Sequence, residues 1–430
     1  MAKMNIIVIG NGIAGFSAAS TLRGLNNPLN VTMISMEKAP LYSACVLPDY
    51  ISGEIPRDHV FVKSERDYMG LGIHTRFGEE VKEIDITSQK LSLNSGKQLP
   101  YDKLIVATGS EAIVLSEIKY GVYKLKTLQD AEEILNHDGR KATVIGAGAI
   151  GIEIGIALHR KGYKVTLLEM VDQILPLGLD PRAADKVKVI LQDHGIEVFN
   201  GERGEKILGG DRVEGVLTNK RELGCDTLIW AVGMRPRVDL AIQAGIALGS
   251  KGGIRVNSRM ETSIPDVYAC GDCIESDDIL TGEPYMHLFW HNANRQGLVA
   301  ARNSAGLVTG YRGSQSTLNV DVFGNHVVGF GFTEMALNRF KDIKAFGGKL
   351  PPLSIIEKEK GESYYRLVMA GERCMGGQFI NPGQMSQGVG LLWSYMAQRR
   401  SVKELLKVLE DEELMRHRPW TRRLKPFFVA

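Results

Sequence analysis

Two glycine-rich segments constrain the fold of this chain more than any other feature. The first, Gly10–Gly15 (GNGIAG), follows a short β-branched run and precedes a segment of small residues, and Gly146–Gly151 (GAGAIG) repeats this context. With this spacing, the first glycine permits a tight turn, the second lets a diphosphate approach the backbone, and the third lets helix and strand pack closely. The phosphates then lie at the positive end of the helix. Each segment therefore predicts a Rossmann-like dinucleotide-binding unit.

An acidic residue is expected about 20 positions beyond such glycines, where it binds the ribose hydroxyls. Glu169 directly follows the apolar run Val165–Leu168, whereas Glu37 lies slightly beyond the run Val31–Ile34. A carboxylate at this place repels a 2′-phosphate, and no arginine follows Glu169 in residues 170–172. The second unit is therefore expected to prefer NADH to NADPH.

Two complete units predict two dinucleotides, and FAD with a nicotinamide nucleotide is the simplest pair. An internal duplication with one working site is the alternative. Two further apolar strands end in small residues, at Thr108-Gly109 and at Gly233, where backbone can approach a ligand. Asp272 follows another strand and a glycine, and it is placed to accept a hydroxyl hydrogen bond from a sugar or ribityl chain.

Cys45 follows the predicted ribose-binding turn and is expected near the reactive end of a bound dinucleotide. If the next residues, 46–51, are helical, the thiol lies at a helix N-terminus, where the helix dipole favours the thiolate. The alternative is a small buried side chain, the usual state of a free cysteine.

Composition excludes several other classes of function. The chain has 430 residues with 52 basic and 50 acidic side chains, and it has no basic arm of the kind that binds nucleic acid. No apolar run approaches the ~20 residues of a membrane span. The first strand begins too early to leave room for a signal peptide. Five scattered cysteines do not form a secreted disulfide framework, so a reducing, cytoplasmic setting is expected.

No metal site is predicted. Cys270 and Cys273 have CxxC spacing, and His287 and His291 are four residues apart, but no further ligands accompany either pair. Buried cysteines and surface or core histidines are the favoured interpretation, with a redox pair as the alternative for the cysteines.

From about residue 311 the chain has glycine-rich strands and then a helical tail, without a nucleotide motif. The expected strands are Val320–Phe323, His326–Phe332, Tyr364–Met369 and Met375–Ile380, and the expected helices are Met385–Met396 and Val402–Leu414. This part is expected to cover the active face and to pair subunits.

The motifs GNGIAG, YDKLIVATGS, VIGAGAIGIEIG, LIWAVGMRP and VYACGDC occur in this order across about residues 4–305. In this combination the chain resembles the flavin-dependent pyridine nucleotide–disulfide oxidoreductases. The resemblance implies an α/β fold with two Rossmann-like domains, for FAD and NAD, and an α+β C-terminal interface domain in a homodimer. The implied boundaries are residues 1–117 and 249–310 for the split FAD domain, 118–248 for the NAD domain and 311–430 for the interface domain.

The resemblance also implies roles for single residues. Asp272 is expected at the ribityl–phosphate region of the flavin, and the helix that contains Ala293 and Gln296 is expected to start near its pyrimidine edge. Glu153 matches a family glutamate found near the flavin and the nicotinamide. The expected FAD ligands are Gly10, Gly12, Ile13, Ala14, Gly15, Glu37, Ser43, Thr108, Gly109, Asp272 and Ala293, and the expected NAD ligands are Gly146, Gly148, Ile150, Gly151, Glu169 and Gly233.

The family divides by its cysteine chemistry. The Cys-x4-Cys pair of glutathione-reductase-like members is absent, since the next cysteine after Cys45 is Cys225. CVLPDYISG is similar to the single-cysteine branch of coenzyme A-disulfide reductases, NADH oxidases, NADH peroxidases and persulfide or polysulfide reductases. Cys45 and Glu153 are therefore the expected catalytic residues. The C-terminal tyrosine motif of coenzyme A-disulfide reductases is not evident, which leaves coenzyme A open as a substrate.

The predicted function is an NADH oxidoreductase that passes hydride to FAD and electrons on to a disulfide, persulfide or polysulfide through Cys45. With an inert Cys45, the same scaffold could be an NADH oxidase that reduces O₂. It could also be a reductase of a redox protein such as rubredoxin, or resemble the flavin portion of nitrite reductase. A non-catalytic NADH sensor or partner subunit is the alternative outside enzymes.

Overall fold

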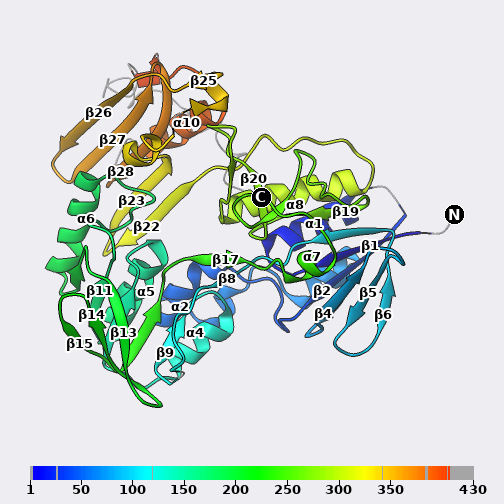
Figure 1. Ribbon diagram of the computed structural model, residues 1–430, viewed down its shortest axis with the longest axis horizontal. Helices are drawn as coiled ribbons and strands as arrows, with labels where there is room; N and C mark the ends of the chain where they lie inside the picture. Colours follow the sequence, from blue (N-terminus) through cyan, green and yellow to red (C-terminus); the bar gives the residue numbers. More distant parts are fainter. Residues whose placement is uncertain are drawn as a thin grey trace.

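The computed structural model describes residues 3–25, 28–118, 120–340, 342–382, 386–403 and 405–406. In these residues the protein is an α/β structure with two five-stranded parallel sheets, one five-stranded antiparallel sheet and several smaller sheets (Figure 1). Among the helices of this part of the chain, none has the length and apolar character needed to cross a lipid bilayer.

The first parallel sheet is built from two distant parts of the chain. Its strand order is β19-β7-β1-β2-β3, and all its pairs are parallel. The helices α1 (Ile13–Gly24) and α8 (Trp290–Ser304) pack against each other beside it. The strands are β1 Met4–Ile9, β2 Leu29–Ser35, β3 His74–Phe77, β7 Lys103–Val106 and β19 Val267–Ala269. The small antiparallel sheet of β4 Val81–Asp85, β5 Lys90–Leu93 and β6 Gln98–Pro100 extends this unit.

The second parallel sheet has the order β12-β11-β10-β16-β9 and repeats the strand–loop–helix arrangement of the first. Its strands are β9 Val122–Lys124, β10 Lys141–Ile145, β11 Lys164–Leu168, β12 Glu197–Phe199 and β16 Thr227–Trp230. Its helices are α4 Leu128–Leu135, α5 Ala149–Arg160 and α6 Pro181–Asp193, and β13 Gly204–Gly209, β14 Val213–Thr218 and β15 Glu222–Gly224 form an added antiparallel sheet. The predicted Rossmann-like pair is therefore confirmed.

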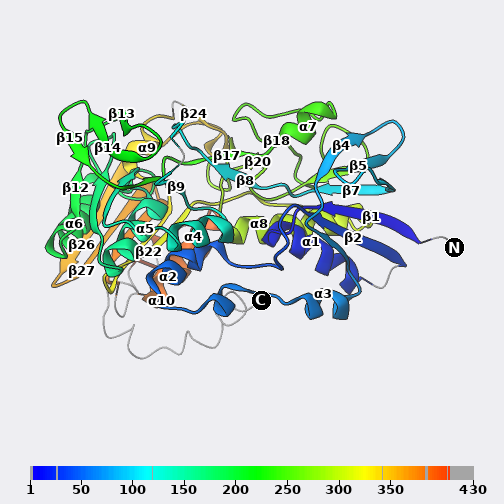
Figure 2. The same ribbon diagram turned by 90° about the horizontal axis from the view of Figure 1, so that it is seen from below.

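Two short strands connect the units. β8 (Ser110–Ala112) and β17 (Met234–Pro236) pair antiparallel, and Figure 2 shows them between the two parallel sheets. Each directly follows one of the predicted glycine-ended strands. Other short elements are α2 Leu47–Ser52, α3 Glu65–Leu71, α7 Asp239–Gln243, β18 Ile254–Arg255, β20 Ile274–Asp277, β21 Pro284–Tyr285, β24 Asp342–Ile343 and β25 Gly348–Lys349, with 3₁₀ turns at Ala44–Val46, Arg57–Val60 and Lys344–Phe346.

The last part of the chain forms an antiparallel sheet of order β22-β23-β28-β27-β26. The strands are β22 Thr317–Val322, β23 Asn325–Gly331, β26 Leu353–Lys360, β27 Ser363–Ala370 and β28 Arg373–Ile380, with the helices α9 Glu334–Leu337 and α10 Ser386–Ala397. The four expected strands are present, but β26 was not predicted. Most of the second expected tail helix, Val402–Leu414, lies outside the described residues. The domain boundaries at residues 117, 248 and 310 stay predictions.

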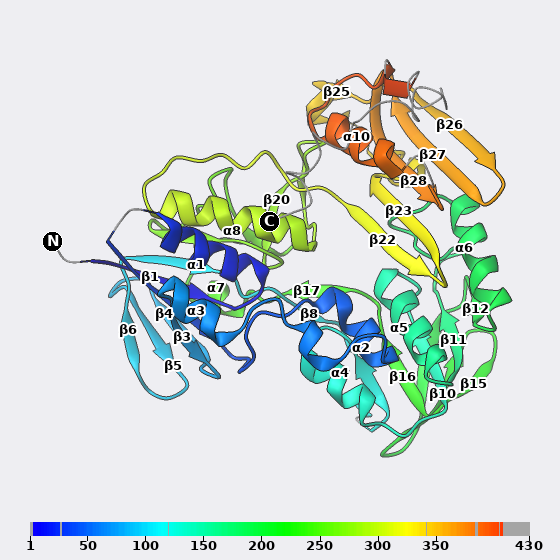
Figure 3. The same cartoon turned by 180° about the vertical axis from the view of Figure 1, so that it is seen from behind.

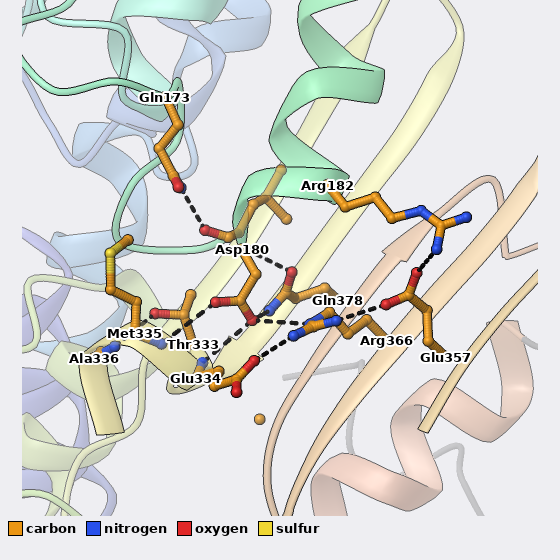
Figure 4. Close-up of polar contacts among 12 residues, drawn as sticks. Gln173, Asp180, Arg182, Thr333, Glu334, Met335, Ala336, Glu357, Arg366 and Gln378 are labelled. Carbon is orange, nitrogen blue, oxygen red and sulfur yellow. Dashed lines mark hydrogen bonds and ion pairs between the residues drawn. The ribbon is translucent and has the colours of Figure 1, made fainter. Parts of the chain in front are cut away.

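A buried polar cluster connects this sheet to α6 of the second unit (Figure 4). Asp180, the residue before α6, is 2% exposed and accepts hydrogen bonds from Gln378 Nε2 (2.5 Å) and from the backbone N–H of Glu334 (3.2 Å). Arg366 Nε lies 3.3 Å from the same carboxylate, and its other nitrogens bond Glu357 and Glu334. Because a buried charge is tolerated only with such partners, the cluster fixes α6 against β27 and β28.

Candidate active site

The first glycine loop has the geometry of a diphosphate cradle. Gly10 has a φ of +111°, and a Cβ there would lie 2.0 Å from the carbonyl oxygen of Ala107. A Cβ on Gly15 would lie 2.1 Å from the oxygen of Gly10. Gly12, which precedes α1, has open space at its Cβ position and gives the helix no side-chain cap. The first N–H groups of α1, from Ile13 on, are therefore available to an anion.

The second glycine loop repeats this geometry residue for residue. Gly146 has a φ of +102°, and its Cβ would lie 2.4 Å from the oxygen of Ala231. A Cβ on Gly151 would lie 1.9 Å from the oxygen of Gly146, whereas Gly148 faces open space before α5. Ile150 follows in the first turn of α5. Both loops therefore fit a bound diphosphate.

The two predicted ribose-binding carboxylates have different surroundings. Glu169 Oε2 accepts a hydrogen bond from the N–H of Ala147 in the glycine loop (2.8 Å). Glu37 instead accepts one from the hydroxyl of Tyr42 (2.6 Å), which in turn accepts one from the N–H of Leu128 (3.1 Å). Burial, followed by the charge of Glu37, raises the pKa of the Tyr42 hydroxyl. Tyr42 thus orients Glu37, a contact that the sequence did not indicate.

Cys45 lies in a 3₁₀ turn, Ala44–Val46, that leads into the short helix α2 (Leu47–Ser52). Its side chain is exposed, whereas the other four cysteines are buried, and all five lie in described residues. The thiol borders a cavity of about 480 Å³ that Glu153 of α5 and Asp321 of β22 also line. Figure 3 shows α2 beside α5, with β22 next to α5. The structure therefore brings the two predicted catalytic residues to one cavity.

The residues expected at the flavin converge beside the first glycine loop. A Cβ on Gly271 would lie 2.7 Å from the Cβ of Ala14 and 3.9 Å from that of Ala293. The N–H of Gly271 donates to Gln296 Oε1 (2.9 Å). The strand end before Asp272 and the start of α8 are therefore packed against the start of α1, as a shared nucleotide site requires.

Asp272 has two partners that the sequence did not indicate. Its Oδ2 accepts a hydrogen bond from Ser110 Oγ (2.9 Å) and lies 3.0 Å from Lys126 Nζ. Lys126 precedes Thr127, the N-cap residue of α4. Its position beside Asp272 therefore depends on where α4 packs, and no sequence motif indicates it. Gly109 and Gly233 have φ values of +72° and +109° and open space at their Cβ positions, as expected for strand ends that face a ligand. The hydroxyl of Thr108 donates to the carbonyl of Arg237 (2.7 Å).

A family model described as "Pyridine nucleotide-disulphide oxidoreductase" matches residues 4–297. This span contains both glycine loops, Cys45 and Asp272. The chain belongs to this family. It is an NADH-dependent flavoprotein oxidoreductase, as the motifs predicted.

Three similar proteins illustrate the range of this family. A Methanocaldococcus jannaschii protein named NADH oxidase is 34% identical over 400 residues, which cover 86% of this chain and 88% of that protein. The structure of reduced Bacillus anthracis CoADR-RHD matches with a TM-score of 0.85 and 27% identity, covering 94% of this chain and 76% of the other. An NAD-dependent persulfide reductase from A. fulgidus matches with a TM-score of 0.85 and 28% identity, covering 94% and 79%.

The polypeptide around Cys45 raises the pKa of its thiol. Although the side chain remains accessible to solvent, the protein atoms packed around it remove part of its hydration, and this desolvation is the main cause. The charge of Glu153 is the second cause, whereas a hydrogen bond from Ser43 and the charge of Lys126 lower the pKa. The helix expected after Cys45 is present but starts at Leu47, so the thiol lies two residues before its first turn, and the helix-end effect on the thiolate stays a prediction. Burial and the charge of Asp49 raise the pKa of Glu153 to about 7.

The other cysteines and histidines considered from the sequence are buried or half-buried side chains that do not line the cavity beside Cys45. Cys270 and Cys273 are fully buried free thiols, and Cys273 Sγ contacts the carbonyl of Cys270 (3.3 Å). His287 is a core histidine, with Nε2 2.9 Å from Oδ2 of the buried Asp278. Burial lowers the pKa of His291 to about 4. Within the described ranges, no group of three or more His, Cys, Asp or Glu side chains could hold a metal ion.

Proposed function

We propose that this oxidoreductase delivers electrons from NADH to a disulfide, persulfide or polysulfide acceptor through Cys45. The observation that supports the proposal is the position of this thiol: it is the one exposed cysteine, and it borders the same cavity as Glu153. A thiol that must attack an incoming sulfur needs such access, whereas a structural cysteine does not.

The two cradles supply the cofactor sites of the proposal. Flavin binding is assigned to Gly10, Gly12, Ile13, Ala14, Gly15, Glu37, Ser43, Thr108, Gly109, Asp272 and Ala293, and NADH binding to Gly146, Gly148, Ile150, Gly151, Glu169 and Gly233. When bound, FAD supplies the two-electron chemistry that connects NADH oxidation to sulfur reduction. The protein contributes the backbone N–H groups that hold the phosphates and the carboxylates that hold the riboses.

The cysteine step balances as an ordinary thiol–disulfide exchange. The Cys45 thiolate attacks one sulfur of the acceptor RSSR, which forms the Cys45–SR mixed disulfide and releases RS⁻. Two electrons and one proton then release RSH and restore the Cys45 thiolate. The sum is NADH + H⁺ + RSSR → NAD⁺ + 2 RSH. Because the pKa of Glu153 is about 7, its carboxyl can hold the proton that the departing thiolate needs.

A homodimer in the cytoplasm completes the proposal. The five free cysteines support a reducing compartment, since secreted proteins usually pair such thiols. The C-terminal sheet is assigned to subunit pairing, and the domain boundaries are those given by the family resemblance.

The test compares the wild type with Cys45→Ser after confirming that both retain flavin. NADH-dependent reduction of a disulfide or polysulfide should be lost in Cys45→Ser and retained in Cys225→Ser, a control at a buried thiol. Undiminished disulfide and polysulfide reduction by Cys45→Ser would refute the proposal.

Reduction of O₂ is the second candidate function, and the 34% identical relative named NADH oxidase favours it. In this case O₂ consumption would be rapid and would persist in Cys45→Ser. If the acceptor is a redox protein such as rubredoxin, NADH oxidation would also persist in Cys45→Ser, but it would require addition of that protein.

A further inference from the structure

The cavity beside Cys45 has an unbalanced set of charges. Four carboxylates line it, from Asp49, Glu54, Glu153 and Asp321, and Arg160 is the one basic side chain among its lining residues. Arg160 already forms an ion pair with Glu54, since its Nη1 lies 2.5 Å from Glu54 Oε2. Asp49, Asp321 and Glu153 therefore remain without a basic partner in the lining when Glu153 is ionised, and Asp49 and Asp321 remain so when it is protonated.

These carboxylates affect one another across the cavity. Burial, then the charge of Glu54, and also that of Asp321, raise the pKa of Asp49, and only Arg160 opposes them. Asp321 accepts a hydrogen bond from the N–H of Gly324 (2.9 Å), and the nearest ring nitrogen of His326 is 3.6 Å away. With one arginine among four carboxylates, the lining keeps a net negative charge when Asp49, Glu54 and Asp321 are ionised.

We propose that this cavity selects the acceptor by charge, admitting uncharged or cationic small disulfides and persulfides to Cys45 and disfavouring polyanionic ones. The inference rests on the proposed function. Carboxylates along a narrow path attract cations and repel anions before any specific contact forms. A polyanionic thiol derivative such as a nucleotide-containing disulfide would bring its phosphates against Asp321 and Glu54, with no unpaired base among the lining residues to receive them.

The first experiment labels Cys45 in the flavin-loaded enzyme and needs no turnover. Two methanethiosulfonates of the same length are compared at pH 8: the cationic trimethylammonium-ethyl reagent and the anionic sulfonato-ethyl reagent. The rate at which each reagent labels Cys45 is divided by its rate of reaction with free 2-mercaptoethanol, which corrects for intrinsic reactivity. Cys45→Ser serves as the blank. We expect the cationic reagent to label Cys45 about tenfold faster after this correction.

Charge-neutral variants identify the source of the preference. In Asp321→Asn and in Glu54→Gln the ratio of the two labelling rates should fall about threefold, because each change removes one unit of negative charge. Asp138→Asn makes the same change at a side chain that is 97% exposed and does not line the cavity, so its ratio should match the wild type. Equal corrected rates for both reagents, or a ratio that neither cavity variant changes, would overturn the inference.

The second experiment uses three disulfides with the same two-carbon arms: cystamine, bis(2-hydroxyethyl) disulfide and 3,3′-dithiodipropionate. We expect kcat/KM to fall in that order, with bis(2-hydroxyethyl) disulfide unaffected by Asp321→Asn. A cationic labelling preference without reduction of any of the three supports the charge selection and refutes the proposed disulfide acceptor. Faster reduction of the dianion than of cystamine overturns the charge selection while retaining the acceptor class.

Discussion

The carboxylate of Glu169 accepts a hydrogen bond from the N–H of Ala147, with 2.8 Å between Oε2 and the nitrogen. The other carboxylate oxygen, Oε1, accepts a second hydrogen bond, from the N–H of Val171 (3.2 Å). These two bonds fix the carboxylate at the edge of the glycine loop that we propose as the NADH cradle. If Glu169 binds the ribose as we propose, such preorganisation would strengthen its hydrogen bonds to the ribose hydroxyls and its repulsion of a 2′-phosphate.

Glu169→Ala should therefore raise the KM for NADH about tenfold to a hundredfold, the loss expected for hydrogen bonds to a charged group. The KM for NADPH should rise less or fall, because the repulsion is removed as well. Steady-state kinetics with both nucleotides check this, with Glu205→Ala, an exposed surface carboxylate, as the control. An unchanged ratio of kcat/KM for NADH to that for NADPH would contradict it.

Two glycines of the same cradle should respond differently to a methyl group. A Cβ on Gly151 would lie 1.9 Å from a backbone oxygen, so Gly151→Ala should lower stability by about 1–3 kcal/mol or more. Gly148→Ala meets nothing within 4 Å and should leave the melting temperature nearly unchanged. It should nevertheless weaken NADH binding at least about tenfold, because the methyl group occupies the space of the diphosphate. Thermal melts with NADH titrations separate the two effects, and a stable Gly148→Ala with normal NADH affinity would be the contrary result.

The features that the sequence could predict depend on residues close together in the chain. The glycine loops follow from backbone sterics within a few residues, and the Rossmann-like pair follows from the loops. β26 could not be predicted from its local pattern, because it is an edge strand in which no residue is buried and it lacks the alternation of apolar and polar residues that indicates a strand.

Contacts between distant segments could not be predicted in this way. The cavity shared by Cys45 and Glu153 exists because α2 packs on α5, and the ion pair of Asp272 with Lys126 depends on where α4 lies. The sequence indicated the helix after Cys45, but it could not give the desolvation that raises the thiol pKa, because desolvation depends on the packed structure.

The cluster around Asp180 should be strongly sensitive to the loss of Arg366. Arg366→Ala leaves the carboxylate of Asp180, whose side chain is only 3% exposed, without its guanidinium partner, and it leaves Glu357 with Arg182 alone. We expect a loss of about 3–5 kcal/mol in unfolding free energy. Arg182→Ala removes an ion pair to the same Glu357 from a side chain that is 61% exposed, so its cost should be at most about 1 kcal/mol. Denaturant unfolding measures both, and equal losses would show that the cluster is not a buried junction.

The charge of Glu153 and that of Lys126 act on the Cys45 thiol in opposite directions. Glu153 raises the thiol pKa and Lys126 lowers it, after the larger effect of burial. Because the pKa of Glu153 is about 7, its negative charge is mostly absent at pH 6 and mostly present at pH 8. Ionisation of Glu153 therefore opposes that of Cys45 only on the alkaline side, and the two groups titrate as a coupled pair.

Glu153→Gln should accordingly make Cys45 more reactive at pH 8 and leave its reactivity nearly unchanged at pH 6. Lys126→Met should have the opposite effect at pH 8, since it removes a positive charge and leaves Asp272 unpaired. The measurement is the rate of iodoacetamide alkylation of Cys45 in the flavin-loaded enzyme from pH 6 to 10, because only the thiolate reacts. Slower alkylation of Glu153→Gln than of the wild type at pH 8 would mean that the glutamate assists the thiolate, which would reverse the sign of the coupling that this geometry predicts.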